Sequence, residues 1–243
     1  MKKNLSFLVG FLLLAIATIA QSQKPRFRIG ASAGPAFPMG YFKAPQVYSI
    51  YPGHMVAPSA AKNGYSISLT PAVRLFKGVD AFLLLSASYF LQDEVSMKKY
   101  VQDMHWHMSG GWQRPLDFQM SMHHWKVYRI LPGLEGRFSN LFNTQLGFSP
   151  QIAAGVVKAK QPGYTYYYQD PQQSAGGWFS GWELKTAFAY EAGAEVFYEF
   201  PKNITVNIGA NYFKSEPRLK AFDKVKQPVE WWGITAGVAW SFY

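Results

Sequence analysis

Hydrophobic and polar positions alternate with a period of two at the end of the chain, from 230 to 243. From Trp232 onward the even positions are apolar, with aromatic residues at both tips, and the odd positions are small or polar: Trp232, Ile234, Ala236, Val238, Trp240 and Phe242 against Gly233, Thr235, Gly237, Ala239 and Ser241. A period of two predicts a β-strand. An apolar face with aromatic tips is typical of a strand that faces lipid in a membrane barrel, so the polar face is predicted to line a lumen.

The same alternation recurs in seven earlier segments, which are 26–37, 64–76, 81–91, 124–138, 144–157, 182–200 and 204–213. In the second of them, Tyr65, Ile67 and Leu69 alternate with serines and a threonine. Together with the last segment, the chain therefore predicts eight strands.

The connections between these segments alternate between long and short. The long ones are 38–63, 92–121, 158–181 and 214–229, and the short ones are 77–80, 139–143 and 201–203. In an antiparallel barrel every second connection lies on the same side. We therefore predict an all-β, eight-stranded antiparallel up-and-down transmembrane barrel, with long extracellular loops, short periplasmic turns and both ends of the mature chain in the periplasm. A soluble secreted β-sandwich is the alternative, although it has no reason to sort its loops in this way.

The first residues have the pattern of a secretory signal peptide. Lys2 and Lys3 precede an apolar run over 5–17, and Thr18-Ile19-Ala20 is a small-x-small cleavage site. Cleavage after Ala20 would divide the chain into a signal peptide (1–20) and a barrel domain (21–243). The chain has no cysteine, which excludes a lipoprotein anchor and disulfides. No other stretch approaches the roughly 18 consecutive apolar residues of a membrane helix, so an integral membrane protein of this sequence would be a barrel.

Two local features and the eight-strand plan resemble a known family. The features are the Gly-x-x-x-Pro region within 30–42 and the proline in the predicted strand 124–138. They resemble the outer-membrane β-barrel domain family abundant in Bacteroidetes, which includes PorT-like members and small barrels of the OmpX type. The resemblance implies a bacterial outer-membrane location and a barrel whose last strand closes it and ends in an aromatic residue. It carries over no functional residues.

Charged residues occur at inward positions of the predicted strands. They are Arg28, Arg74, Arg129, Glu135, Arg137, Lys185, Glu191, Glu195 and Glu199. An eight-stranded barrel is just wide enough for side chains to fill it, and charges there need partners because desolvation is costly. The set predicts a plug of salt bridges, with a proton or ion path as the alternative, and disfavours a pore for large solutes.

Four prolines lie inside predicted strands, at 35, 71, 132 and 150. Each removes a donor from the strand ladder. They predict local bulges or, alternatively, a weak seam at which another protein docks.

Histidines and methionines gather in and after the second long connection. His105, His107, His123 and His124 are interleaved with Met104, Met108, Met120 and Met122. Imidazole and thioether ligands suit copper, so a metal site is one hypothesis. No carboxylate or cysteine pattern completes it, and a solvated or partner-facing loop is the alternative.

The long connections are also rich in aromatic and basic residues. The aromatic residues include Tyr48, Tyr51, Trp106, Trp112, Tyr166, Tyr167, Tyr168 and Trp178, which could bind a protein partner or sugars, or pack on one another. The basic residues, which gather near the predicted outer rim, are Lys126, Lys158, Lys160, Lys214, Arg218, Lys220, Lys224 and Lys226. This basic ring predicts contact with membrane lipid and lipopolysaccharide phosphates, and disfavours nucleic acid as a partner.

Three functions fit these patterns. The leading one is a non-enzymatic structural or accessory subunit, without a cofactor, of a larger outer-membrane complex for secretion, uptake or barrel assembly. The second is an enzyme that modifies lipid A, for which the loop pairs His107 and Ser109, or Ser121 and His123, lack a placed carboxylate. The third is a small channel or a metal-binding surface protein.

Overall fold

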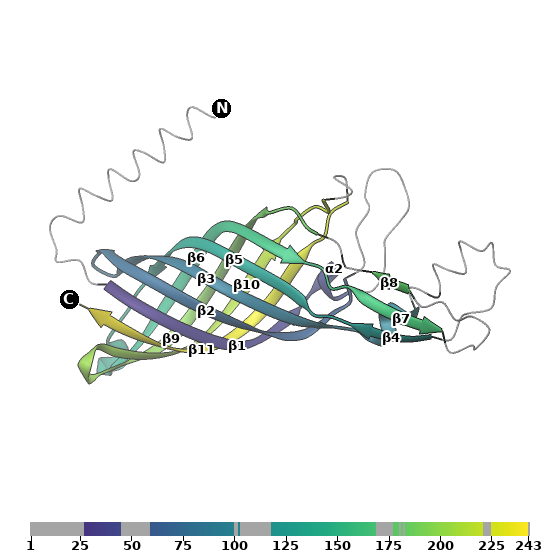
Figure 1. Cartoon of the computed structure of the whole chain (residues 1–243). Coiled ribbons are helices and arrows are strands. Elements are labelled where there is room, and N and C mark those ends of the chain that lie inside the picture. Colours follow the sequence, from purple (N-terminus) through teal and green to yellow (C-terminus); the bar gives the residue numbers. More distant parts are fainter. Residues whose placement is uncertain are drawn as a thin grey trace, which may run out of the picture.

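The computed structural model describes residues 27–44, 59–99, 102, 118–168, 177–179, 181, 183–220 and 225–242. Within these residues, eight antiparallel strands close into a barrel in the order β1-β11-β10-β9-β6-β5-β3-β2 (Figure 1). The strands are β1 (Phe27–Pro38), β2 (Ala61–Phe76), β3 (Val79–Gln92), β5 (Trp125–Gly136), β6 (Leu146–Lys160), β9 (Ala187–Phe200), β10 (Ile204–Ser215) and β11 (Val229–Phe242). The predicted eight-stranded antiparallel barrel is confirmed.

The last strand closes the barrel by pairing with the first. Phe27 lies opposite Phe242, and the register continues to Pro38 opposite Trp231. The start of β1 and the end of β11 therefore lie at one end of the barrel. The three short connections lie at this same end: a turn at 77–78, η1 (Leu141–Asn143) and η2 (Pro201–Asn203). We call it the short-turn end and the opposite one the loop end.

Outward positions alternate with inward positions along every strand, as the sequence predicts. On β11, Trp240 is 57% exposed, whereas its neighbours Ala239 and Ser241 are 8% and 6% exposed. On β5, Tyr128 and Ile130 are exposed and Val127, Arg129 and Leu131 are buried. The outer wall is therefore apolar, and a single change of register would expose the inner face to the surroundings.

The sixth predicted strand begins later than the sequence pattern indicates. Ladder pairing starts at Ala187, whereas the pattern places the start at position 182. Glu183 and Leu184 instead form isolated bridges with Lys160 and Leu219. Lys160 is the last residue of β6 and Leu219 lies beyond the end of β10, so both bridges belong to the loop end.

The long connections carry regular structure that the sequence analysis did not predict. β4 (Phe118–Met122), β7 (Tyr164–Tyr168) and β8 (Gly177–Phe179) form a small sheet beyond the loop end (Figure 1), residues 94–99 are helical, and α2 (Gly40–Lys43) is a single turn. A signal for β4 was available: Phe118, Met120 and Met122 alternate with Gln119 and Ser121, which is a period of two.

The strand prolines interrupt pairing without shifting it. The β2–β3 ladder skips Thr70 and Pro71, and the β5–β6 ladder skips Leu131 and Pro132, yet the pairs on either side keep one register. The β1–β11 ladder behaves in the same way at Pro35, and Pro150 remains paired with Ala194. The predicted bulges are therefore wrong at these sites, since a missing amide donor removes hydrogen bonds but inserts no extra residue.

Among the residues that the structure describes, no helix is long and apolar enough to cross a membrane.

Candidate functional site

The lumen contains three arginine–carboxylate pairs that join strands far apart in the sequence. Arg28 on β1 contacts Glu135 on β5, and Arg129 on β5 contacts Glu191 on β9. Arg137, just after β5, pairs with Glu199 on β9 at 2.8 Å. These six residues belong to the predicted lumen network. Because the two strands of each pair are not neighbours in the barrel, each pair joins non-adjacent parts of the wall through the lumen.

Neutral side chains add hydrogen bonds to these ions. The Asn211 Nδ2 group donates to Glu191 Oε1 at 2.7 Å, and an Arg129 guanidinium nitrogen donates to Ser66 Oγ at 3.1 Å. Such bonds are needed because they offset the solvation free energy that a buried ion pair loses on leaving water. Cross-linked in this way, the middle of the lumen is a packed polar core.

Three other members of the predicted network lie in different surroundings. Arg74 pairs with Asp80 at 3.2 Å, an acid that the sequence analysis had assigned only to a tight turn. Glu195 accepts a hydrogen bond from Asn207 Nδ2 at 2.5 Å. Lys185 is a correction: it lies before β9, outside the barrel ladder, and is exposed. Its amide nitrogen donates to the Arg218 carbonyl oxygen at 2.8 Å.

Only small spaces remain between these polar side chains. Two hollows of about 30 Å³ each share Ser32, Thr70, Gln151 and Glu195 among their lining residues. A space of this size holds about one water molecule. The described lumen therefore offers room for single waters and not for a hydrated solute.

The loop end of the lumen is filled by aromatic side chains, which we call the aromatic plug: Phe42, Phe90, Trp125, Phe213 and Trp231. All five are 0% exposed. The ring of Phe42 lies 5.0 Å from that of Phe90 and 5.2 Å from that of Trp125, both edge-on, and Phe213 stacks on Trp231 at 4.1 Å. Edge-on and offset contacts of this kind are favoured between aromatic rings.

Phe42 reaches the lumen from outside the strands. It lies on α2, and the preceding Met39 amide donates to the Glu230 carbonyl oxygen of β11 at 3.0 Å. The Trp125 indole nitrogen donates to the Ser59 carbonyl oxygen at 3.1 Å, which fixes the far side of the same connection. Both ends of the first long connection are therefore attached to the plug.

The expectation that inward positions are polar is wrong at the loop end. Phe90, Trp125, Phe213 and Trp231 occupy inward positions there. A signal was present in Trp231-Trp232, because two consecutive tryptophans in a strand place one ring on each face. Tyr89-Phe90 repeats the pattern on β3.

Arg129 connects the two parts of the lumen. Its guanidinium contacts Glu191 and also lies 5.0 Å from the Phe213 ring centroid and 4.9 Å from that of Trp231. Cation–π contacts are strongest away from water. Arg129 is thus the boundary between the ion pairs and the aromatic plug.

Half of the predicted partner-binding and metal residues belong to the described part of the chain. Tyr48, Tyr51, Trp106, Trp112, His105 and His107 lie outside the described residues, as does the predicted signal peptide. The backbones of Tyr166, Tyr168 and Trp178 belong to β7 and β8, and Tyr167 is 61% exposed. His123 and His124 are exposed between β4 and β5. In the described part of the chain, no three side chains of the histidine, aspartate and glutamate type group into a metal site.

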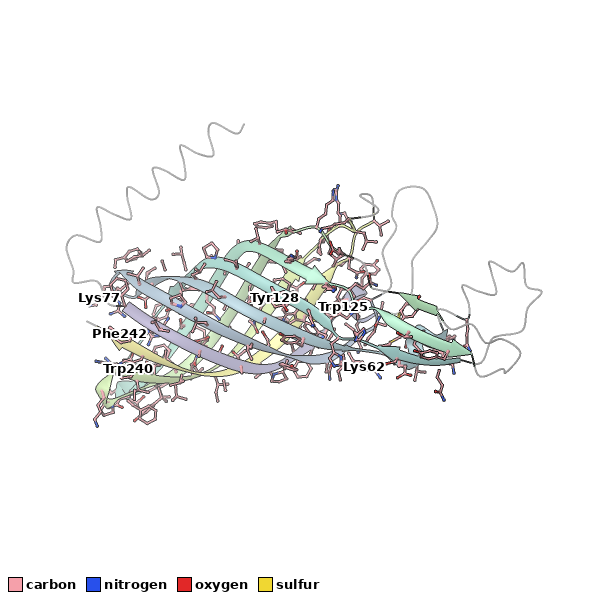
Figure 2. The ribbon with its side chains drawn as sticks, viewed as in Figure 1. Lys62, Lys77, Trp125, Tyr128, Trp240 and Phe242 are labelled. Carbon is pink, nitrogen blue, oxygen red and sulfur yellow. The ribbon has the colours of Figure 1, made fainter. Side chains whose placement is uncertain are left out.

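Aromatic residues mark both ends of the outer wall. At the short-turn end Trp240 stacks on Phe242 with ring centroids 5.7 Å apart, and at the loop end Tyr65 stacks on Tyr89 at 5.2 Å. Figure 2 shows Trp240 and Phe242 beside Lys77 at one end and Lys62 at the other. Amphipathic rings in two belts are typical of the two interfaces of a bilayer.

No protein-family model and no curated protein sequence matches this chain. It is similar in structure to OprG of Pseudomonas aeruginosa, an outer membrane protein, with 12% identity over 91% of this chain and 97% of that chain and a TM-score of 0.48. It is also similar to Neisserial surface protein A, with 11% identity over 90% and 100% and a TM-score of 0.45. Ail, the attachment invasion locus protein of Yersinia pestis, has 10% identity over 90% and 99% and a TM-score of 0.40.

Proposed function

We propose that this protein is an integral outer-membrane β-barrel with a sealed lumen, and that it serves as a non-enzymatic structural or accessory subunit of a larger outer-membrane complex. The observation that carries the proposal is the division of every strand between an apolar outer face and an inner face filled by ion pairs or aromatic rings. Such a wall needs lipid on its outside, and such a lumen has no room for a passing solute.

Closure of the sheet supports a membrane location. A closed barrel pairs the backbone groups of all its strands with neighbours and leaves no edge facing hydrocarbon. Its strands are 12 to 16 residues long, more than the 9 to 11 or so that cross a bilayer when tilted. The extra length allows them to extend beyond the membrane at the loop end.

The sealed lumen supports an accessory role over a channel. If solutes do not pass through the barrel, the surfaces available for its function are the outer wall and the segments beyond the loop end. Those segments carry exposed aromatic residues such as Tyr167, which suit a protein interface. The features that resemble the Bacteroidetes barrel family, PorT-like members included, fit the same role.

Membrane insertion is tested by refolding the chain into vesicles and floating them on a density gradient. We expect the protein to float with the lipid and to show a folded band of altered mobility in unheated electrophoresis samples. Recovery of folded protein only in the soluble fraction would contradict the membrane location.

The accessory role is tested by gentle detergent extraction of the native membrane, with a tag in the turn at Pro201–Asn203, followed by mass determination. A stoichiometric larger partner is expected. A lone monomer near the mass of the mature chain would contradict the accessory role and leave the barrel itself unaffected.

The sealed lumen and the absence of enzymatic activity are tested by separate measurements. We expect no discrete conductance steps in planar bilayers, and unchanged lipid A acyl chains when the protein is overproduced. Regular single-channel steps would overturn the sealed lumen, and an altered acyl pattern would replace the subunit proposal with the enzyme.

A further inference from the structure

Three lysines form a cluster on the outer wall at the loop end of β5 and β6. Lys126 lies directly opposite Lys160 in the β5–β6 ladder, and Lys158 lies opposite Tyr128. All three lysines are exposed and alternate with the buried Val127, Val157 and Ala159, so they point away from the lumen. We call Lys126, Lys158 and Lys160 the lysine cluster.

The lysine cluster is an unfavourable arrangement unless something neutralises it. Like charges directly opposite one another in a sheet are destabilising. Within the described part of the chain, none of the three lysines takes part in an ion pair, whereas Lys214, Lys220 and Lys226 of the predicted basic ring each pair with a glutamate. Three lysines of the basic ring are therefore compensated, whereas the three of the lysine cluster are not.

One carboxylate lies close to the cluster and is already engaged. Glu183 bridges to Lys160 through the backbone, but its side chain contacts Lys220. The hydrogen bond from Lys220 is the main reason that the pKa of Glu183 is lowered, and the charges of Lys158 and Lys160 add to it. Three ammonium groups thus share a single carboxylate, which leaves a net positive charge for an external anion.

A hollow adjoins the lysine cluster where the small sheet meets the barrel. Its volume is about 380 Å³, and it is lined by Met122, His123, His124, Lys126, Lys160, Gln161, Pro162 and Gly163. The His123 amide donates to the Gly163 carbonyl oxygen at 3.1 Å and thereby joins the two walls of the hollow. The lining contains two lysines and two histidines and no acid, so the hollow suits an anionic group.

The position along the wall indicates where the anion comes from. Directly below the lysine cluster, the outward residues of the same strands are Tyr128, Ile130 and Val156. Tyr128 forms a side-chain hydrogen bond with Tyr89 on β3, and Figure 2 shows it on the wall between the two barrel ends. Tyrosines above an apolar band mark the membrane interface, and cations just beyond them meet lipid headgroups.

We propose that the lysine cluster and the adjoining hollow bind a phosphate group of an anionic membrane lipid, with lipid A as the chemical type. The lysine ammonium groups contact the phosphate, and His123 and His124 contact the rest of the headgroup in the hollow. Lysine is well suited to this task because its charge is a compact point on a flexible stem. The proposal rests on the membrane-spanning barrel proposed above.

The test is a titration of the refolded full mature chain, in detergent micelles, with lipid A that carries two phosphates, followed by native mass spectrometry. Dephosphorylated lipid A is the matched ligand control. The variant is Lys126→Gln/Lys158→Gln/Lys160→Gln, and the matched protein control is Lys77→Gln/Lys202→Gln, which removes two exposed lysines at the short-turn end. We expect the triple variant to bind about 100-fold more weakly, because each lysine near a lipid surface contributes about fivefold, and the control variant to bind within about twofold of the wild type.

Three results would overturn the proposal: unchanged affinity in the triple variant, equal binding of dephosphorylated lipid A, or full competition by millimolar inorganic phosphate, which would make the site one for a soluble anion. If the triple variant does not refold, Lys160→Gln replaces it, with an expected loss of about fivefold. Flotation of the same preparations with vesicles separates the two proposals, because a failed lipid site leaves flotation intact and a failed membrane barrel does not.

Discussion

The two halves of the lumen are filled by side chains of opposite chemistry. Toward the short-turn end and the middle, the interior is filled by ion pairs such as Arg28 with Glu135. At the loop end it is filled by the aromatic plug, in which Phe42 and Trp231 are fully buried. Both fillings exclude solute, but the first depends on matched charges and the second on matched shapes.

The two halves differ in which parts of the chain supply the side chains that fill them. Every partner in the ion pairs lies on a barrel strand or within a residue of one, so closing the barrel brings the charges together. The aromatic plug also needs Phe42, which lies on a single turn outside the ladder. The polar half is therefore complete once the sheet closes, whereas the aromatic half also requires the first connection to dock.

The largest expected effect comes from breaking the ion pair at the boundary. Glu191→Ala leaves the Arg129 charge buried without its partner and should cost about 3–5 kcal/mol of unfolding free energy. Urea unfolding in micelles, followed by tryptophan fluorescence, measures the loss. The matched control Arg129→Met/Glu191→Leu removes both charges and should cost far less. If the double variant were as unstable as Glu191→Ala, the charge imbalance would not be the cause.

The next largest loss of stability is expected in the aromatic plug. Phe42→Ala should lower the free energy of unfolding by about 2–3 kcal/mol. This is less than the roughly 3–5 kcal/mol expected for truncating an aromatic residue in a closed core, because α2 can detach while the barrel stays folded. Planar-bilayer recordings should still show no conductance, since the Arg129 pair lies below the plug. Discrete channel steps in Phe42→Ala would show instead that the plug alone seals the lumen.

A smaller effect is expected for Glu195, which lies in the polar half but has a neutral partner. Its carboxylate accepts a hydrogen bond from Asn207 and is half-buried. Glu195→Ala should therefore cost about 1–2 kcal/mol in the same urea measurement, clearly less than Glu191→Ala. Equal losses for the two variants would mean that an arginine partner adds nothing in this lumen.

The polar half was predictable from the sequence and the aromatic half was not, for a physical reason. A charge on one face of an alternating strand is costly unless it lies inside the barrel beside a partner. The strand pattern therefore identifies four inward residues, which are Arg28, Arg129, Glu135 and Glu191. Trp125 gives no such signal, since an aromatic residue is acceptable on either face of a membrane barrel, and Trp231 is indicated only by the tryptophan beside it. The choice of pairs could not be predicted either, because it depends on the barrel's closure and tilt, which bring side chains of β5 and β9 together across the intervening strand β6.

The loop-end structures escaped prediction for a related reason. In the small sheet, β4 pairs with β7 across more than 40 residues and from a different connection, whereas β7 and β8 pair within one connection. Its sequences, rich in tyrosine and methionine, suit a strand as well as a partner-facing loop. Only the pairing between connections decides between the two, and pairing is a tertiary property.

The smallest effect concerns the helical segment that begins beside the aromatic plug. Asp93 precedes it, accepts a hydrogen bond from Ser96 Oγ at 2.8 Å and pairs with Lys62 at 3.1 Å. Partial burial alone would raise the pKa of Asp93, but the bonds from Ser96 and Lys62 outweigh it and hold the pKa below its ordinary value of 3.8. A lowered pKa means that the charged form favours the folded state. Its contribution is therefore present above the ordinary value and is lost as the pH falls through the folded-state pKa.

Asp93→Asn should consequently lower stability at pH 7 by about 0.5 kcal/mol, since the pair is largely exposed to solvent, and the difference from the wild type should disappear at acidic pH. Urea unfolding from pH 7 down to acid measures this difference. Lys62→Gln should reduce it, because the ammonium is one of the two partners of the carboxylate. A difference that persists unchanged into acid would assign the effect of the substitution to packing and not to the charge of Asp93, unlike the effects expected for the polar half.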